Sequence, residues 1–218
     1  MSTYPTILAE IERHHAKLVA VSKTKPVALL REFYDQGQRR FGENRVQELV
    51  DKSSQLPEDV EWHFIGHLQR NKVKYIAPIV HLIHGVDSPR LLEEINKRAA
   101  QHDRVISCLL QFHIAEEATK HGMDLEEAEA LLSSESYRSL QHVQIHGVMG
   151  MATYTDDEHQ VRKEFRHLKK IFITLKTKYF ASSSVFNELS MGMSGDYKIA
   201  LAEGSTMVRI GSLLFGTR

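Results

Sequence analysis

Short apolar runs alternate with longer amphipathic segments along the whole chain. The apolar runs predict eight strands, at residues 18–23, 40–44, 61–66, 81–87, 106–114, 145–152, 185–192 and 207–212. Most of these runs show little alternation between apolar and polar positions, which is typical of parallel strands covered by helices.

The amphipathic segments between the strands predict helices. They lie at residues 27–36, 45–54, 69–76, 89–101, 125–133, 157–179 and 196–202, and a further helix at 6–15 precedes the first strand. Residue types at the expected helix starts agree with this. Ser88 can cap a helix whose first turn holds Pro89, and Asp124 precedes a turn that carries two glutamates.

Eight strands alternating with helices are compatible with a closed barrel or with an open, doubly wound sheet. The even size of the units and the lack of a glycine fingerprint after the first strand favour the barrel. We therefore expect an α/β fold in which residues 1–218 form one (β/α)₈ TIM barrel with an extra N-terminal helix.

Composition narrows the class of protein. The 28 Lys and Arg residues balance 28 Asp and Glu residues, so no net charge attracts nucleic acid or an anionic membrane. No apolar stretch reaches the roughly 20 residues of a transmembrane helix, and the N-terminus lacks the apolar core of a signal peptide. The single Cys108 cannot form an internal disulfide. We expect a cytoplasmic protein that binds neither nucleic acid nor membrane.

Lys23 ends the first apolar run, and Pro26 follows soon after. The C-terminal ends of barrel strands face the active site, so this lysine would project into the catalytic mouth, where its amine could attack an aldehyde. Lys25 could line the same mouth. Position alone favours an ordinary surface lysine at a strand end, so it identifies no cofactor.

The loops after the seventh and eighth strands form a candidate phosphate site. Barrels often bind phosphate there, and these loops supply hydroxyl groups, glycines and an arginine: Ser190, Gly192, Ser194, Arg209, Gly211 and Ser212. A helix expected near Asp196 would direct its positive N-terminus to the same place. In the alternative interpretation, Ser194 caps that helix and the glycines only turn the chain.

Several longer motifs occur in order between about Lys17 and Arg218. They are AVSKTKP at 20–26, FGEN at 41–44, WHFIG at 62–66, LQRNK at 68–72, LSMGMS at 189–194 and GSTMVRIG at 204–211. In these motifs the chain resembles the pyridoxal-phosphate homeostasis protein family, a family of barrels related to the N-terminal domain of alanine racemase.

The resemblance implies a fold-type III barrel that holds pyridoxal 5′-phosphate (PLP) as a Schiff base on Lys23. It implies that the cofactor is bound by Asn44, Ser190, Gly192, Ser194, Arg209, Gly211 and Ser212. Arg209 matches the arginine that alanine racemases place against the pyridine nitrogen, although the phosphate is an alternative partner. Two residues depart from the family pattern, His67 where proline is common and His113 where asparagine is common.

Three functions remain compatible with the sequence. The resemblance implies a PLP carrier in vitamin B6 homeostasis, without catalytic residues or robust turnover, whose candidate recipients are PLP-dependent apo-enzymes. A racemase would need a second base besides Lys23, normally a tyrosine from a second domain of a partner subunit. The chain has no room for that domain, and Tyr154 and Tyr197 are not obvious substitutes, so we also expect a monomer. The third function is an enzyme that acts on a phosphorylated metabolite.

The histidines do not predict a metal site. His63 and His67 are four residues apart, but His63 lies on an expected strand, where that spacing does not place two ligands on one face. The pairs His81/His84 and His142/His146 also lack the carboxylate or thiol neighbours of a recognisable metal motif. We expect no bound metal.

Overall fold

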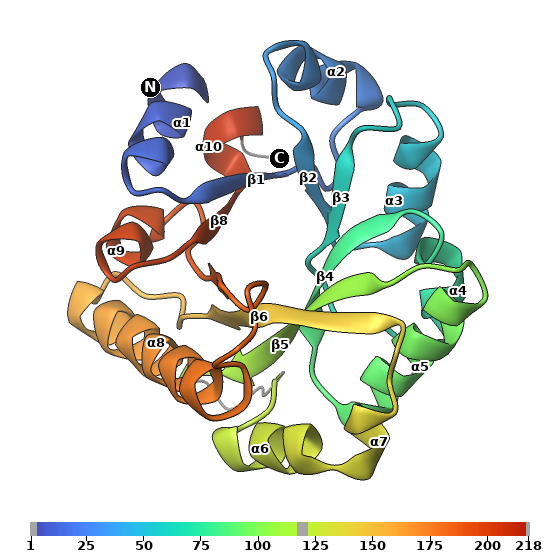
Figure 1. The fold of residues 1–218 in the computed structure, drawn as a ribbon. Coiled ribbons are helices and arrows are strands. Elements are labelled where there is room, and N and C mark those ends of the chain that lie inside the picture. The colour runs from blue at the N-terminus through green and yellow to red at the C-terminus, as the bar shows by residue number, and fades with distance from the viewer. Residues whose placement is uncertain (1–3, 117–121, 217–218) are drawn as a thin grey trace.

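The computed structural model describes residues 4–116 and 122–216. Its eight strands are parallel and close into a barrel in chain order, β1 to β8 (Figure 1). The strands are β1 Lys17–Val21, β2 Arg40–Glu43, β3 Glu61–Phe64, β4 Val80–Val86, β5 Ile106–His113, β6 Val143–Met151, β7 Glu188–Ser190 and β8 Met207–Ile210. The closed (β/α)₈ barrel expected from the alternating pattern is confirmed.

The helices lie outside the ring of strands (Figure 1). They are α1 Tyr4–Arg13, α2 Val27–Asp35, α3 Val46–Ser53, α4 Val73–Ile76, α5 Pro89–Ala100, α6 Leu125–Ser133, α7 Glu135–Arg138, α8 Glu158–Tyr179, α9 Tyr197–Ala202 and α10 Ser212–Phe215. Helix α1 is the extra N-terminal helix, and it buries Tyr4, Ile7 and Ile11.

The structure differs from the expected elements mainly in short segments. The helix expected at 69–76 begins as a single 3₁₀ turn, Arg70–Lys72, before α4. Strand β8 ends at Ile210, and Ser212 opens α10 instead of closing the strand. Helices α7 and α10 have four residues each, which is too short for a 3.6-residue period to be recognised in the sequence.

Two apolar regions make up the core. The larger one lies between the strands and the helices, and it includes Phe41, Phe112 and Phe165. A small cluster fills the inside of the barrel with Val19, Leu82, Leu109, Met149 and Met207. The barrel is therefore a packed core and not a pore, with polar side chains left near its two faces.

Among residues 4–116 and 122–216, no helix is both long and apolar enough to span a membrane.

Candidate functional site

Lys23 lies two residues beyond the end of β1, in a turn at the C-terminal face of the barrel, and is half-buried. The next residue, Thr24, has a φ of 65°, a left-handed conformation that non-glycine residues seldom adopt. Such a backbone persists only where surrounding contacts hold it.

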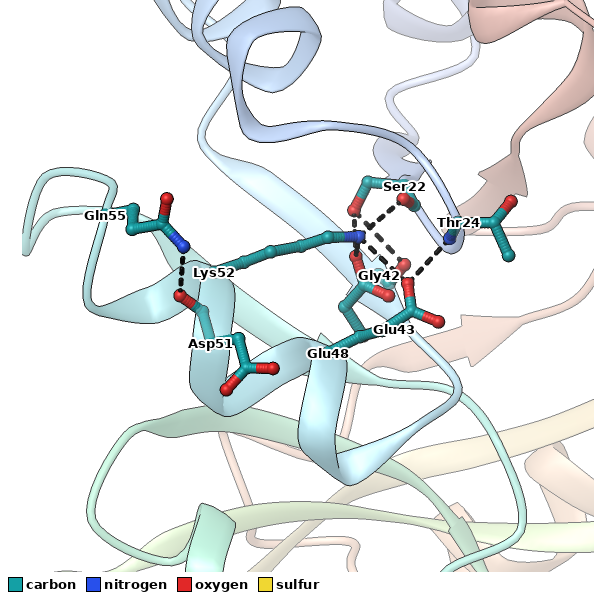
Figure 2. Close-up of polar contacts among 8 residues, drawn as sticks. All are labelled: Ser22, Thr24, Gly42, Glu43, Glu48, Asp51, Lys52 and Gln55. Atoms are coloured by element: carbon teal, nitrogen blue, oxygen red, sulfur yellow. Dashed lines mark hydrogen bonds and ion pairs between the residues drawn. The ribbon is translucent and has the colours of Figure 1, made fainter.

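A buried polar network holds this turn from the side of α3 (Figure 2). Lys52 Nζ donates to Ser22 O at 2.9 Å and to Glu43 Oε1 at 2.7 Å. The Ser22 hydroxyl donates to the same carboxylate oxygen at 2.7 Å. Glu48 Oε2 accepts from Lys52 Nζ at 3.1 Å and from the Thr24 N–H at 2.6 Å. These hydrogen bonds hold the backbone on both sides of Lys23.

The carboxyl group of Glu43 is the most buried member of this network. The Glu43 side chain is 0% exposed and that of Lys52 is 8% exposed. The second carboxylate oxygen of Glu43, Oε2, has no hydrogen-bond partner in the described part of the chain. Burial raises the pKa of Glu43, while the hydrogen bonds from Lys52 and Ser22 oppose that rise. Sequence reasoning included Glu43 only as a letter of a motif and missed Lys52, which lies on a different element.

Arg209 carries a buried positive charge at the same face of the barrel. Its Nη1 donates to Ser190 Oγ at 2.7 Å, and its Nη2 donates to the carbonyl oxygen of Gly150 at 3.1 Å. No carboxylate of the described residues lies within ion-pair distance of this guanidinium. Burial lowers the pKa of Arg209 to about 10, and Asp196 opposes that change. An arginine still keeps its proton at neutral pH, so the charge persists although no carboxylate of the described residues contacts it.

Ser190 continues the network into the barrel through two histidines. Its Oγ lies 3.1 Å from His84 Nδ1, and His84 Nε2 lies 2.9 Å from His63 Nδ1. Burial lowers the pKa of both histidines well below the usual value, so both are neutral at pH 7. We assign Nδ1–H to each ring, because this leaves the partnerless Nε2 of His63 as a lone pair instead of a buried, unmet donor.

This assignment fixes what the Ser190 hydroxyl can do. Its oxygen accepts one hydrogen bond from Arg209 and one from His84, which uses both lone pairs. The hydroxyl hydrogen of Ser190 then remains to be donated to a third group. A ligand with an acceptor atom at this face of the barrel would meet both a positive charge and a hydrogen-bond donor.

The predicted phosphate loops come together at the end of β1. The Gly211 N–H donates to Ser194 Oγ at 3.2 Å, which joins the loop after β8 to the loop after β7. A Cβ on Gly211 would lie 3.2 Å from Val21 O, so this glycine packs tightly against the last residue of β1. Gly192 has a φ of 96°, and a Cβ there would lie 2.5 Å from Ala200 Cβ on α9. Glycine is required at that position by both conformation and space.

Ser212 and Asn44 lie at the same face. Ser212 is the first residue of α10, so its backbone N–H precedes the first hydrogen bond of that helix, from the Leu214 N–H to Gly211 O. Asn44 directly follows β2 and is half-buried. The structure thus brings all the predicted cofactor residues to the face where Lys23 lies.

Lys25 lies in the loop after β1, two residues beyond Lys23. Its Nζ donates to Phe215 O at 3.0 Å and to Gly216 O at 3.1 Å, and so ties the loop after β1 to the end of α10. Of the two residues that depart from the family pattern, His67 lies with its Nδ1 3.3 Å from Asp87 Oδ2, and His113 is the last residue of β5.

Comparisons with known proteins agree with this geometry. Residues 6–218 match the family model described as alanine racemase, N-terminal domain. A pyridoxal phosphate homeostasis protein from Aquifex aeolicus is 43% identical over 204 residues, which are 93% of this chain and 87% of the relative.

Two solved structures illustrate the range of the similarity. PipY of Synechococcus elongatus PCC7942 with PLP bound is 36% identical, with a TM-score of 0.85 over 96% of this chain and 98% of PipY. Alanine racemase from Bartonella henselae with covalently bound pyridoxal phosphate is 16% identical and has a TM-score of 0.72. This chain covers 57% of that racemase, and the likeness concerns the fold alone.

The family expected from the motifs is thus confirmed by the relatives, and the expected barrel by the closed sheet and its structural neighbours. The chain belongs to the pyridoxal phosphate homeostasis protein family, within the wider alanine racemase N-terminal domain family.

Proposed function

We propose that this protein binds PLP at the C-terminal face of its barrel, as a Schiff base on Lys23, and carries it for PLP homeostasis without robust turnover. The observation that carries the proposal is the buried Arg209 guanidinium, which has no carboxylate of the described residues within ion-pair distance. A buried charge of this kind is costly unless a ligand completes its environment. The name of the Aquifex aeolicus relative and the PLP bound in the PipY structure support the same ligand.

The residues of this face fit the parts of the cofactor. The glycine-containing loops that meet near Val21 offer backbone N–H groups and hydroxyls of the kind that bind phosphate, from Gly192, Ser194 and Ser212, while the Gly211 N–H holds the Ser194 hydroxyl in place. Arg209 and the Ser190 hydroxyl are suited to the ring, and Asn44 is suited to a ring substituent. PLP supplies the aldehyde and the electron-withdrawing ring, and the Lys23 amine supplies the nucleophile.

An arginine directed at the ring nitrogen suits a carrier better than a catalyst. The positive guanidinium disfavours protonation of that nitrogen, because two adjacent positive charges repel. A ring that stays unprotonated withdraws electrons less strongly, which weakens the chemistry for which enzymes use this cofactor. We propose this orientation for Arg209, with the phosphate bound by the two loops.

The two tyrosines weighed as a second base do not fit that role. The Tyr197 hydroxyl donates to Glu10 Oε2 on α1 at 2.8 Å, and burial together with that carboxylate raises the pKa of Tyr197 to about 12. The Tyr154 side chain is 97% exposed. A racemase needs a base on each face of the ring, so these positions favour the carrier over the racemase.

We further propose that the protein works as a single-barrel monomer in the cytoplasm. Its lone cysteine, Cys108, is buried in β5, as expected of a structural thiol in a reducing compartment. Size-exclusion chromatography with light scattering tests the oligomeric state, and a dimer mass would contradict this part of the proposal.

The attachment site is tested by the visible absorption of protein-bound PLP. We expect Lys23→Ala to abolish this band, and Lys97→Ala, a control at an exposed lysine in the last turn of α5, to retain it. Borohydride reduction followed by peptide mass spectrometry should place the covalent label on residue 23 of the wild-type protein. A label on any other lysine would contradict the proposed attachment.

The carrier role is tested separately with the PLP-loaded protein. Incubation with L- and D-amino acids should show no turnover at ordinary enzymatic rates, which are of order 1–10³ s⁻¹. Turnover in that range would overturn the carrier role and leave the PLP site standing. Transfer of PLP to a PLP-dependent apo-enzyme, followed by recovery of that enzyme's activity, would support it.

A further inference from the structure

Glu61, His63 and His81 come together at the N-terminal face of the barrel, opposite Lys23. Glu61 is the first residue of β3, His63 is two residues further along the same strand, and His81 is near the start of β4. One possible ligand atom from each side chain lies within 4.8 Å of the other two. Sequence reasoning compared histidines along the chain and therefore missed this group, which two adjacent strands create.

A β-bulge in β4 explains why His81 joins the group. Trp62 pairs with Val80 and His63 pairs with Leu82, so β4 has one more residue than β3 at this point, and that residue is His81. Bulges of this kind redirect a side chain and are frequent at barrel rims. The His81 ring stacks on the His63 ring, with 5.7 Å between centroids and 26° between planes.

His63 points independently to a missing partner. Its side chain is buried, and its Nδ1 is occupied by His84, whereas its Nε2 has no hydrogen-bond partner among the described residues. A buried ring nitrogen without a partner is uncommon in native structures. The atom that lacks a partner is the one that remains for coordination, since Nδ1 is already used.

The protonation and orientation of these groups suit a metal. Burial lowers the pKa of both His63 and His81, so neither ring must lose a proton to coordinate at neutral pH. Arg40 Nε binds Glu61 Oε2 at 2.8 Å, which orients the carboxylate. Because Oε2 is used in this ion pair, Oε1 is the Glu61 atom that remains to bind a metal. Metal ligands are commonly held by such outer hydrogen bonds, and the contact of His63 Nδ1 with His84 is a second example.

We propose that Glu61, His63 through Nε2, and His81 bind a borderline divalent cation of the Zn²⁺ class. Two imidazoles and one carboxylate are an established ligand set for zinc, with water in the fourth position. Tetrahedral bonds of about 2.1 Å put ligand atoms roughly 3.4 Å apart, so ligand atoms that now lie within 4.8 Å of one another must approach by about 1.4 Å at most. His81 and Glu61 lie near the surface and can make that adjustment, while the buried His63 stays in place.

The charged side chains around the group are of both signs, and besides burial the charges of Arg40, Arg104 and Lys17 lower the pKa of His81, while that of Glu61 raises it. Lys17 at the start of β1 forms an ion pair with Glu188 of β7, and Arg40 forms one with Glu61. His146 on β6 lies with its Nε2 3.1 Å from Ser107 Oγ, and burial lowers its pKa. A cation at this face would therefore meet the acidic side chains Glu61 and Glu188, the basic side chains Lys17, Arg40 and Arg104, and neutral imidazoles.

The test is a Zn²⁺ titration of the full-length, tag-free protein by calorimetry, after free PLP has been removed. We expect one equivalent of Zn²⁺ to bind to the wild-type protein. His81→Ala and Glu61→Gln should each weaken that binding by about 10- to 100-fold or more, as the loss of a ligand or of its support does elsewhere. His159→Ala and Glu126→Gln are the matched controls and should leave it unchanged, because these exposed residues lie in the first turns of α8 and α6, on the side of the C-terminal strand ends. Co²⁺ in place of Zn²⁺ should give d–d absorption that His81→Ala removes.

The outcomes separate the alternatives. Failure to bind Zn²⁺ below millimolar concentration would overturn the proposal. So would binding that both variants retain, because the metal would then lie at other histidines. His81 and Glu61 reach the surface, so their variants should fold, and circular dichroism checks this. The PLP site lies on the opposite face, and the result stands whether or not Lys23 carries PLP.

Discussion

Replacing Lys52 by methionine tests the network that holds the turn around Lys23. Methionine keeps the length and apolar character of the side chain and removes only the ammonium group. That group binds Ser22 O, Glu43 Oε1 and Glu48 Oε2. Glu48 is partly exposed and keeps its hydrogen bond from the Thr24 N–H, so water can replace the contact that Glu48 loses with Lys52. Glu43, which is fully buried, would lose its only cationic partner among the described residues.

The expected loss of stability follows from that uncompensated charge. Removing one partner of a buried ion pair costs about 3–5 kcal/mol. Burial already raises the pKa of Glu43, so in Lys52→Met this carboxyl can escape part of the cost by taking up a proton. Holding it protonated costs about 1.4 kcal/mol for each pH unit above its folded pKa. We therefore expect a loss near the lower limit, about 3 kcal/mol at pH 7.5.

The sign of the pH dependence follows from the direction of the shift. The folded pKa of Glu43 is raised above its unfolded value, so folding takes up a proton as pH falls. Its contribution to stability is fully present below the unfolded pKa and is lost as pH rises through the folded pKa. The deficit of Lys52→Met should thus shrink as pH falls from 7.5 towards 5. The double variant Lys52→Met/Glu43→Gln has no buried carboxyl to titrate and should show no such recovery.

Urea unfolding measures these free energies. Trp62 is the only tryptophan and is 3% exposed, so its fluorescence reports unfolding of the barrel, and circular dichroism provides a second probe. We expect the double variant to be more stable than Lys52→Met at pH 7.5, because a neutral amide in place of the Glu43 carboxylate leaves no uncompensated charge. Equal stabilities of the two variants at that pH would refute the reasoning. Weaker PLP attachment in folded Lys52→Met would show that the network also positions Lys23.

Three further predictions concern single residues. Arg209→Met should abolish PLP attachment, measured by absorption, while leaving the urea midpoint of the cofactor-free protein unchanged or higher, since an unpaired buried charge is removed. Gly192→Ala should destabilise the protein by about 1–3 kcal/mol in the same unfolding assay, because φ is 96° and the new Cβ would meet Ala200. Burial raises the pKa of the Cys108 thiol, so a thiol reagent should label it slowly until urea exposes β5.

Elements of the barrel could be predicted because parallel strands buried on both sides are continuous apolar runs. For the same reason the strand ends were located closely enough to bring Lys23, Ser190 and Arg209 to one face of the barrel. The closed barrel then brings these residues together, because all eight C-terminal strand ends lie at that face. The pattern could not locate helices of about one turn, such as α7 and α10, because one turn is too short to show a repeat.

Contacts between elements were beyond sequence reasoning for a physical reason. Lys52 and Glu48 are four residues apart on α3, a common surface spacing, and nothing in that spacing shows that the pair turns inwards to Glu43. His81 is a stronger example. With regular alternation along β4, the His81 side chain would lie on the opposite side of the strand from those of Leu82 and His84. Only the bulge brings His81 to His63.

The hydrogen-bond chain from His63 through His84 and Ser190 to Arg209 connects the two faces of the barrel. Neutral rings allow this chain only two directions, since each histidine that donates through one nitrogen must accept through the other. A cation on Nε2 of His63 permits just the direction that leaves the Ser190 hydroxyl hydrogen for a ligand. A metal at the N-terminal face would therefore favour an acceptor at the face where Lys23 lies. Because such coupling is reciprocal, PLP would strengthen metal binding by the same factor.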